Sequence, residues 1–428
     1  MEILVLVLGF VVLVGIRVPV AWSIGIASLL TILISINSIP AFTTIAQRVV
    51  TGLDSFSLLA IPFFILAGHI MNHGGIAKRL IEFAKSLVGS LPGGLAHVNI
   101  VAAMMFGAIA GSAGAAAAAI GSFMSERMEK EGYTKEFGVA VNVTSATTGL
   151  LIPPSNIFII YSLASGGVSI GALFLAGYIP GILTGLILMI IALIWAKRKG
   201  FPTGKRSSAS QVFKAFISAL PSLFLLFIII GGIVAGIFTA TEASSVAVVY
   251  CLILAFIYKE VGIKDLKAIL VQSAGTISLV MLLIAMSIAM SWIMSYENIP
   301  QDVTSALLSF SDNPIIVMIL INLILLFIGI FMDMTPAVLI FTPIFLPVAT
   351  AMGIDPVHFG IIMVLNLCIG LCTPPVGAVL FIGVGVANTT IQKVIKPLLP
   401  LFAGMLISLI LVILFPQLSL WLPELFGF

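Results

Sequence analysis

The sequence predicts an all-α polytopic membrane protein made of two inverted-topology repeats, each with a re-entrant helical hairpin and a broken transmembrane helix. Of its 428 residues, 61% are hydrophobic and 8% are charged, whereas a soluble globular domain carries about 25% charged residues. Two long apolar runs each contain a Pro-Pro pair, Pro153-Pro154 and Pro374-Pro375, and proline breaks a helix because it lacks an N–H. The two pairs lie 221 residues apart, and other features recur at the same distance, which indicates an internal repeat.

The first repeat is predicted over residues 1–196. Residues 3–36 read as two spans. Residues 40–54 read as an amphipathic helix that lies along the membrane interface, because their apolar side chains share one helical face. Residues 55–72 form a third span, followed by a charged loop with Lys78, Arg79, Glu82 and Lys85.

Residues 95–124 predict a re-entrant hairpin. They are too long for one straight span and too short for two, since each crossing takes about 20 residues. Glycine and serine at the centre favour a turn near Gly111–Gly114. Residues 137–163 form the first broken span, and residues 171–195 complete the repeat.

A basic linker rich in serine and glycine, residues 197–214, separates the halves, and the pattern then restarts over residues 215–428. The predicted elements of the second repeat are two spans within 219–258, an amphipathic helix at 262–275, a hairpin at 315–350 and a broken span at 358–386.

Topology follows from the number of crossings. If a hairpin makes no net crossing, each repeat crosses the membrane five times, so the second repeat starts from the opposite side and is inverted. Lys and Arg are enriched in cytoplasmic loops. With the linker in the cytoplasm, Arg48 is the only one of 19 Lys and Arg left outside, and the predicted loops at Glu297–Asp312 and near Asp355 hold acids and no bases, as expected outside. Both termini are then periplasmic.

The two hairpin tips and the two breaks should meet near the membrane midplane. A break frees carbonyl oxygens at one helix end, which suit Na⁺, and N–H groups at the next, which suit a carboxylate. The predicted Na⁺ ligands are Gly111, Ser112, Thr147, Thr148, Gly149, Asp333, Met334, Thr335, Gly370, Cys372 and Thr373. The predicted substrate contacts are Pro154, Ser155, Asn156 and Pro375.

Structural explanations compete with these roles. Small residues also let membrane helices pack closely. Asp333 is an intramembrane carboxylate, which indicates cation binding or proton coupling, but it could instead cap a helix at the tip. Glu242 reads as an interfacial helix cap. A metal site at His69 and His73, or at the cysteine pair on the second broken run, is disfavoured.

Other classes of function are disfavoured. The glycines of the segment 200–206, GFPTGKR, are spaced by three residues rather than four and follow no strand, so it is not a phosphate-binding loop and ATP hydrolysis is not expected. No Ser/His, paired-Asp or metal constellation lies at membrane depth, which argues against an enzyme. Two inverted hairpins suit alternating access better than a passive channel.

The motifs together resemble a known family. GLLIPPSN at 149–156, GLCTPP at 370–375, IPFFILAGHIM at 61–71, and the tips GSAG at 111–114 and FMDMTP at 331–336 resemble the DctM-like large membrane subunit of tripartite ATP-independent periplasmic (TRAP) transporters. The resemblance covers the whole chain. It implies an elevator mechanism, in which the hairpins and broken spans move against a scaffold formed by the first spans and interfacial arm helices of each repeat.

The resemblance also implies partners and a location. The location is a bacterial inner membrane. The protein partners are a four-helix small membrane subunit on a separate chain and a periplasmic substrate-binding protein. Na⁺ is the driving ion and an organic acid is the substrate, and no nucleic acid is expected. Because the predicted site contains Asp333 and no Lys or Arg, a hydroxylated monocarboxylate such as a sialic acid is favoured over C4-dicarboxylates. The alternative is a stand-alone sodium/dicarboxylate or citrate symporter without a binding protein.

Overall fold

The computed structural model describes residues 2–204, 206–311 and 313–428, and within them the chain is helical apart from one isolated bridge between Pro92 and Thr203. Eight helices in these ranges are long and apolar enough to cross a membrane. The number is nine if the bent pair Lys135–Leu151 and Asn156–Ala164 counts as one span. Lys205 of the predicted linker, Asp312 of the predicted outer segment and Met1 lie outside the described residues.

The first half contains the predicted hairpin and broken span. Its helices are α1 (Glu2–Gly15), α2 (Val20–Ser35), α3 (Ser38–Gly52), α4 (Ala60–His73), α5 (Ile76–Val88), α6 (Gly94–Ala110), α7 (Ala113–Lys130), α8 (Lys135–Thr148), α9 (Asn156–Ala164) and α10 (Ile170–Lys199). Two short 3₁₀ turns, Phe56–Leu59 and Gly149–Leu151, precede α4 and follow α8. The hairpin turns at Gly111 and Ser112, within the predicted segment, and the broken span bends by 53°.

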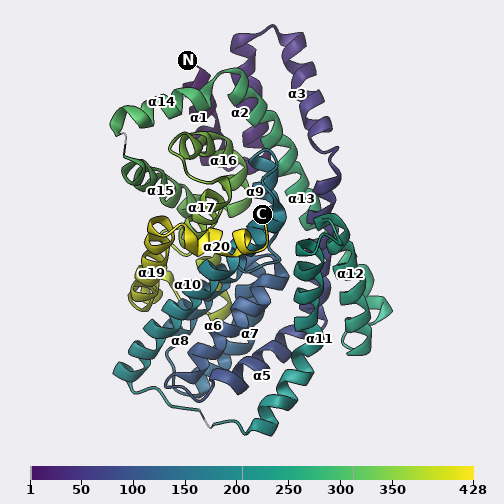
Figure 1. Cartoon of the computed structure of the whole chain (residues 1–428), viewed down its shortest axis with the longest axis vertical. Helices are drawn as coiled ribbons and strands as arrows, with labels where there is room; N and C mark the ends of the chain where they lie inside the picture. Colours follow the sequence, from purple (N-terminus) through teal and green to yellow (C-terminus); the bar gives the residue numbers. More distant parts are fainter. Residues whose placement is uncertain (1, 205, 312) are drawn as a thin grey trace.

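The second half repeats this order. Its helices are α11 (Ala209–Val234), α12 (Ala240–Ile257), α13 (Ile263–Tyr296), α14 (Ile299–Phe310), α15 (Pro314–Phe331), α16 (Met334–Ala351), α17 (Pro356–Gly370), α18 (Ala378–Ala387), α19 (Ile391–Leu414) and α20 (Gln417–Leu425). Shifted by 221 residues, the bounds of α6 and α7 fall within one residue of those of α15 and α16. Figure 1 shows the first hairpin in the lower half of the view and the second in the upper half.

Two predicted loops are wrong, because the chain forms helices there. The segment with Lys78–Lys85 is the amphipathic helix α5, and most of the segment 297–312 is α14, which begins with Ile299 and Pro300 buried. In α5 the buried side chains recur every three to four residues, so one face packs inward while the charged face stays outside. They are Ile76, Ala77, Leu80, Ile81 and Ala84.

The two arm helices differ. In the first half α3 ends at Gly52, and Asp54 and Ser55 interrupt the chain before the next span, as residues that favour turns do. In the second half the predicted arm at 262–275 is not separate, because it continues into the following span as the 34-residue helix α13. The two helices pack side by side, with the Gly52 backbone against Ile288 (Figure 1).

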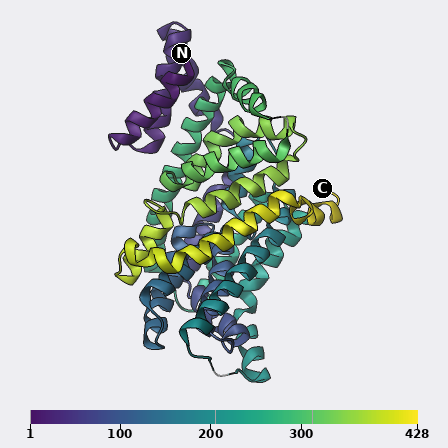
Figure 2. The ribbon, with the colours of Figure 1, turned by 90° about the vertical axis from the view of Figure 1, so that its left-hand side faces the viewer.

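The centre of the molecule is formed by the first segments of the broken spans. Residues 137–148 of α8 and 358–370 of α17 are all buried, as expected of helices that are surrounded by other helices. Figure 2 shows α19 crossing the face of the molecule, where it packs against α8 and α10.

Glycine pairs join each hairpin to its broken span. A Cβ at Gly149 would lie 2.8 Å from the Gly107 Cα, and a Cβ at Gly370 would lie 2.6 Å from the Gly329 Cα. Such close backbone contact is the usual role of small residues between membrane helices. The first arm of each hairpin therefore packs directly on the break.

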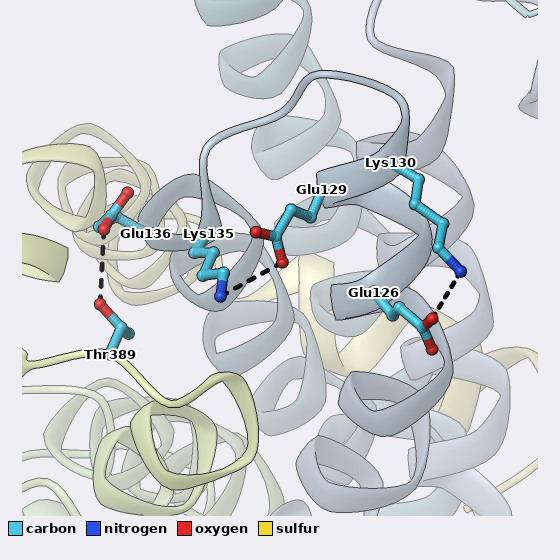
Figure 3. A network of polar contacts seen from close by, with 6 residues as sticks. All are labelled: Glu126, Glu129, Lys130, Lys135, Glu136 and Thr389. Carbon is cyan, nitrogen blue, oxygen red and sulfur yellow. Dashed lines mark hydrogen bonds and ion pairs between the residues drawn. The ribbon is translucent and has the colours of Figure 1, made fainter.

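Charged residues gather around the connection between α7 and α8. Lys135 lies 3.3 Å from Glu129, Lys130 pairs with Glu126, and the Thr389 hydroxyl donates to Glu136 at 3.4 Å (Figure 3). Such exposed contacts contribute about 0–1 kcal/mol each. The Thr389 bond links the end of the second broken span to the start of the first.

Candidate functional site

A cavity of about 420 Å³ lies where the two hairpin tips approach both broken spans. Its volume is within the range of about 300–1,000 Å³ that is usual for ligand pockets. The tips contribute Gly111 and Ser112 from the first half and Asp333, Met334 and Thr335 from the second, as predicted, and Asn156 lines the cavity from the start of α9. Six of the residues predicted for the site therefore share one cavity.

The first tip presents a tight turn to the cavity. Gly111 ends α6 with a φ of +61°, a conformation that glycine adopts without strain. The Ser112 side chain accepts a hydrogen bond from the Ala115 N–H at 3.3 Å and caps α7. A Cβ at Gly111 would lie 2.6 Å from the Asn156 amide nitrogen, so the tip touches the start of α9.

The second tip presents a carboxylate. Asp333 precedes α16, yet its side chain makes no capping hydrogen bond to that helix, and it is exposed to the cavity. Its carboxylate interacts with the backbone N–H of Met334, the first residue of α16, so both explanations of Asp333, cation ligand and helix cap, stay predictions. Glu242, by contrast, accepts from the Thr239 N–H at 2.8 Å and caps α12, as predicted.

The two breaks contact each other, and each also reaches the cavity, which Leu150 lines from the first break and Leu371 from the second. The Thr147 and Thr148 hydroxyls donate to the Thr144 carbonyl at 3.0 and 2.9 Å. Thr147 also lies 3.4 Å from the Cys372 Sγ, and the Cys368 thiol donates to the Thr147 carbonyl at 3.2 Å. Predicted site residues that do not line the cavity are Thr147, Thr148, Gly149, Pro154, Ser155, Gly370, Cys372, Thr373 and Pro375.

Neighbouring residues at the first break differ in their surroundings. Ser155 is 1% exposed, and its hydroxyl is without a hydrogen-bond partner among the described residues. Asn156 follows it, begins α9 and reaches the cavity. Of the four predicted substrate residues, only Asn156 lines the cavity.

Sequence reasoning missed the polar residues that α4 and α13 bring to the cavity wall. His69 and Asn72 of α4 and Thr276 of α13 line the cavity. α4 reaches the tip because Gly68 lets it approach closely, since a Cβ there would lie 2.9 Å from the Ala110 carbonyl oxygen. His69 and Asn72 are three residues apart in an apolar helix and therefore share one face. This spacing could have identified them from the sequence.

A metal centre is not indicated in the ranges that the structure describes, where no three His, Cys, Asp or Glu side chains converge. His69 Nδ1 lies 3.0 Å from the Ser273 hydroxyl, and His73 Nδ1 lies 3.0 Å from the His69 carbonyl. The cysteines of α17 and its break are buried thiols that face carbonyls of α8.

The family model described as "Tripartite ATP-independent periplasmic transporter, DctM component" matches residues 7–418. The chain belongs to this family. It is 54% identical to the uncharacterized protein YgiK of Salmonella typhimurium, over 99% of this chain and 98% of that one. It is 40% identical to the sialic acid TRAP transporter large permease protein SiaM of Vibrio cholerae, over 98% of each chain. It is 41% identical to the C4-dicarboxylate TRAP transporter large permease protein DctM of Vibrio cholerae, over 98% of this chain and 96% of that one.

A solved structure shares the fold. The YdaH transporter of Alcanivorax borkumensis matches with a TM-score of 0.66 at 12% identity, over 87% of each chain. Membership of the TRAP family makes this chain a transporter permease rather than an enzyme. It also implies that the chain lies in a bacterial inner membrane. The partners that it implies are a periplasmic binding protein and a small membrane subunit.

Proposed function

We propose that this chain imports an organic acid, handed over by a periplasmic binding protein, and that an inward Na⁺ gradient drives the transport. The observation that carries the proposal is the cavity where Gly111, Ser112, Asp333 and Thr335 meet Asn156. Hairpin tips and helix ends at membrane depth are the groups that bind substrates and coupling ions in secondary transporters.

Na⁺ fits the donor set at the tips. The groups available are the Asp333 carboxylate, the hydroxyls of Ser112 and Thr335, and backbone carbonyls at the end of α6. These are hard oxygen ligands, and they come from both repeats. At the breaks, the Thr147, Thr148 and Thr373 hydroxyls donate to carbonyls of their own helices, which leaves oxygen lone pairs for a cation, so these residues remain predicted Na⁺ ligands.

The charge of the cavity bears on the substrate. Its described lining contains Asp333 and no Lys or Arg, so a single substrate carboxylate would rely on helix N-termini and bound Na⁺. Similarity does not select the substrate, because the sialic acid and C4-dicarboxylate relatives are equally close, at 40% and 41% identity. We favour a hydroxylated monocarboxylate, such as a sialic acid, over a dicarboxylate.

The packing favours an elevator movement. The glycine contacts of Gly149 with Gly107 and of Gly370 with Gly329 bind each hairpin to its break. The cysteine contacts join the two breaks, so both hairpins and both broken spans form one connected body. That body would move against α3, α13 and the helices packed on them. In the membrane, we expect inverted repeats and periplasmic termini, as the crossing count and the distribution of basic residues predict.

Uptake in proteoliposomes tests the proposal. The chain is reconstituted with its small subunit, and labelled organic acid is added outside with the matching binding protein. We expect uptake to need both the binding protein and an inward Na⁺ gradient. Equal uptake in choline medium would contradict Na⁺ coupling, and equal uptake without binding protein would favour the stand-alone symporter.

A further inference from the structure

His69 differs from the other cavity residues because a hydrogen bond fixes one of its ring nitrogens, Nδ1, as a donor. Its Nδ1 lies 3.0 Å from the Ser273 Oγ, and the same Oγ lies 2.7 Å from the Ile269 carbonyl oxygen. A hydroxyl has one proton to donate, and a carbonyl oxygen can only accept. Ser273 therefore donates to Ile269, and His69 donates its Nδ1 proton to Ser273.

This arrangement leaves Nε2 of the neutral ring as a hydrogen-bond acceptor, because a neutral imidazole carries one N–H. Nε2 has no hydrogen-bond partner among the described residues, while the side chain lines the cavity. Ser273 is 1% exposed, so the group that orients the ring is fixed inside the protein.

The surroundings decide what Nε2 can bind. No Lys or Arg of the described lining can donate to it, and the nearby polar side chains from α4 and α13 are Asn72 and Thr276. The Thr276 hydroxyl donates to its own helix, at 3.2 Å from the Gln272 carbonyl oxygen. An acceptor on the cavity wall beside the first tip suits a donor on the transported molecule. For an organic acid, that donor is a hydroxyl group.

We propose that His69 is a specificity-determining residue whose Nε2 accepts a hydrogen bond from a hydroxyl group of the transported acid. This inference rests on the proposed function, in that it assumes the cavity holds an organic acid. It assigns hydroxyl recognition to α4, while the carboxylate end faces the hairpin tips and the start of α9.

The test compares hydroxylated and deoxy substrates in the reconstituted complex. N-acetylneuraminate, L-malate and succinate are first offered to the wild-type protein, and the transported hydroxy acid is then paired with its single-deoxy analogues. We expect His69→Leu to raise KM for the hydroxy acid about tenfold, as loss of one hydrogen bond predicts, and to leave KM for one deoxy analogue within about twofold. His69→Gln keeps an acceptor oxygen and restores most of the discrimination. His73→Leu, which removes the exposed neighbour one turn away, leaves both KM values unchanged.

Three results would overturn the inference. Transport of succinate alone among the three probes would show that the site needs no hydroxyl. Unchanged discrimination in His69→Leu, or an equal loss for hydroxy and deoxy acids, would reduce His69 to a structural role. Absence of uptake for all three acids, with binding proteins for each supplied, would overturn the proposed organic-acid function and this inference with it.

Discussion

Alanine at the glycine contacts between hairpin and break should disable transport more than it unfolds the protein. In Gly149→Ala the new Cβ would lie 2.8 Å from both the Ala103 carbonyl oxygen and the Gly107 Cα, whereas ordinary contacts begin at 3.4 Å. The neighbouring backbone must therefore move by about 0.6 Å, the difference between these distances. Gly370→Ala is more severe, because its Cβ would lie 2.6 Å from the Gly329 Cα.

The energetic cost can be bounded. Overpacking of a well-packed interior costs about 1–3 kcal/mol, which corresponds to a fall of about 1–3 °C in the unfolding midpoint of a chain of 428 residues. The loss of transport should be easier to detect than this small shift in the midpoint, because the arm that is pushed away, α6, carries the first tip. We expect initial uptake to fall about tenfold or more, since a displacement near 1 Å at a binding site can cost about a hundredfold.

Thermal unfolding in detergent and uptake in proteoliposomes measure the two effects on the same preparations. Gly231→Ala is the matched control, because no atom lies within 4 Å of its Cβ position in α11. Alanine favours a helix interior over glycine by about 0.5–1 kcal/mol, so this variant should keep full uptake and a midpoint at or above that of the wild type. Wild-type uptake in Gly149→Ala and Gly370→Ala would refute the close packing of hairpins on breaks.

Two further predictions concern topology and the first break. In whole cells, an impermeant thiol reagent should label Ser309→Cys from outside but not Ser207→Cys. The three native cysteines are all buried and should not react with the reagent. Labelling of Ser207→Cys alone would reverse the topology. Ser155→Ala should leave KM within about twofold of the wild-type value, because its buried hydroxyl has no partner among the described residues. Asn156→Ala should raise KM about tenfold, because Asn156 lines the cavity. A larger rise in KM for Ser155→Ala than for Asn156→Ala in the uptake assay would place Ser155 in the site.

The sequence predicted the hairpins because their tips differ chemically from the arms. Gly111-Ser112 and Asp333 interrupt runs that are otherwise apolar. The two tips lie at corresponding positions of the repeat, so each supported the prediction of the other. It misread as loops both α5, which carries several charges, and α14, which lies between the acids Glu297 and Asp312, since such stretches look like loops until the buried face is known. Both errors fall at the same place in the two halves, so the repeat could not reveal them.

The site was predicted only in part. Thr147 and Thr148 have the right side chains for Na⁺ but do not line the cavity, because α8 packs there against the second broken span, and the sequence does not show this contact. His69 and Thr276 lie within apolar spans outside the predicted site. Only the packing of α4 and α13 near the tips brings them to the cavity.

The Na⁺ dependence of uptake by Asp333→Asn tests the central claim most directly. Asparagine keeps the shape of the side chain and removes its charge, so loss of a charged cation ligand should raise the Na⁺ concentration for half-maximal uptake about tenfold or more. Asp302→Asn, at an exposed position of α14, is the control and should behave as the wild type. Unchanged Na⁺ activation in Asp333→Asn would contradict a Na⁺ site at the second hairpin tip.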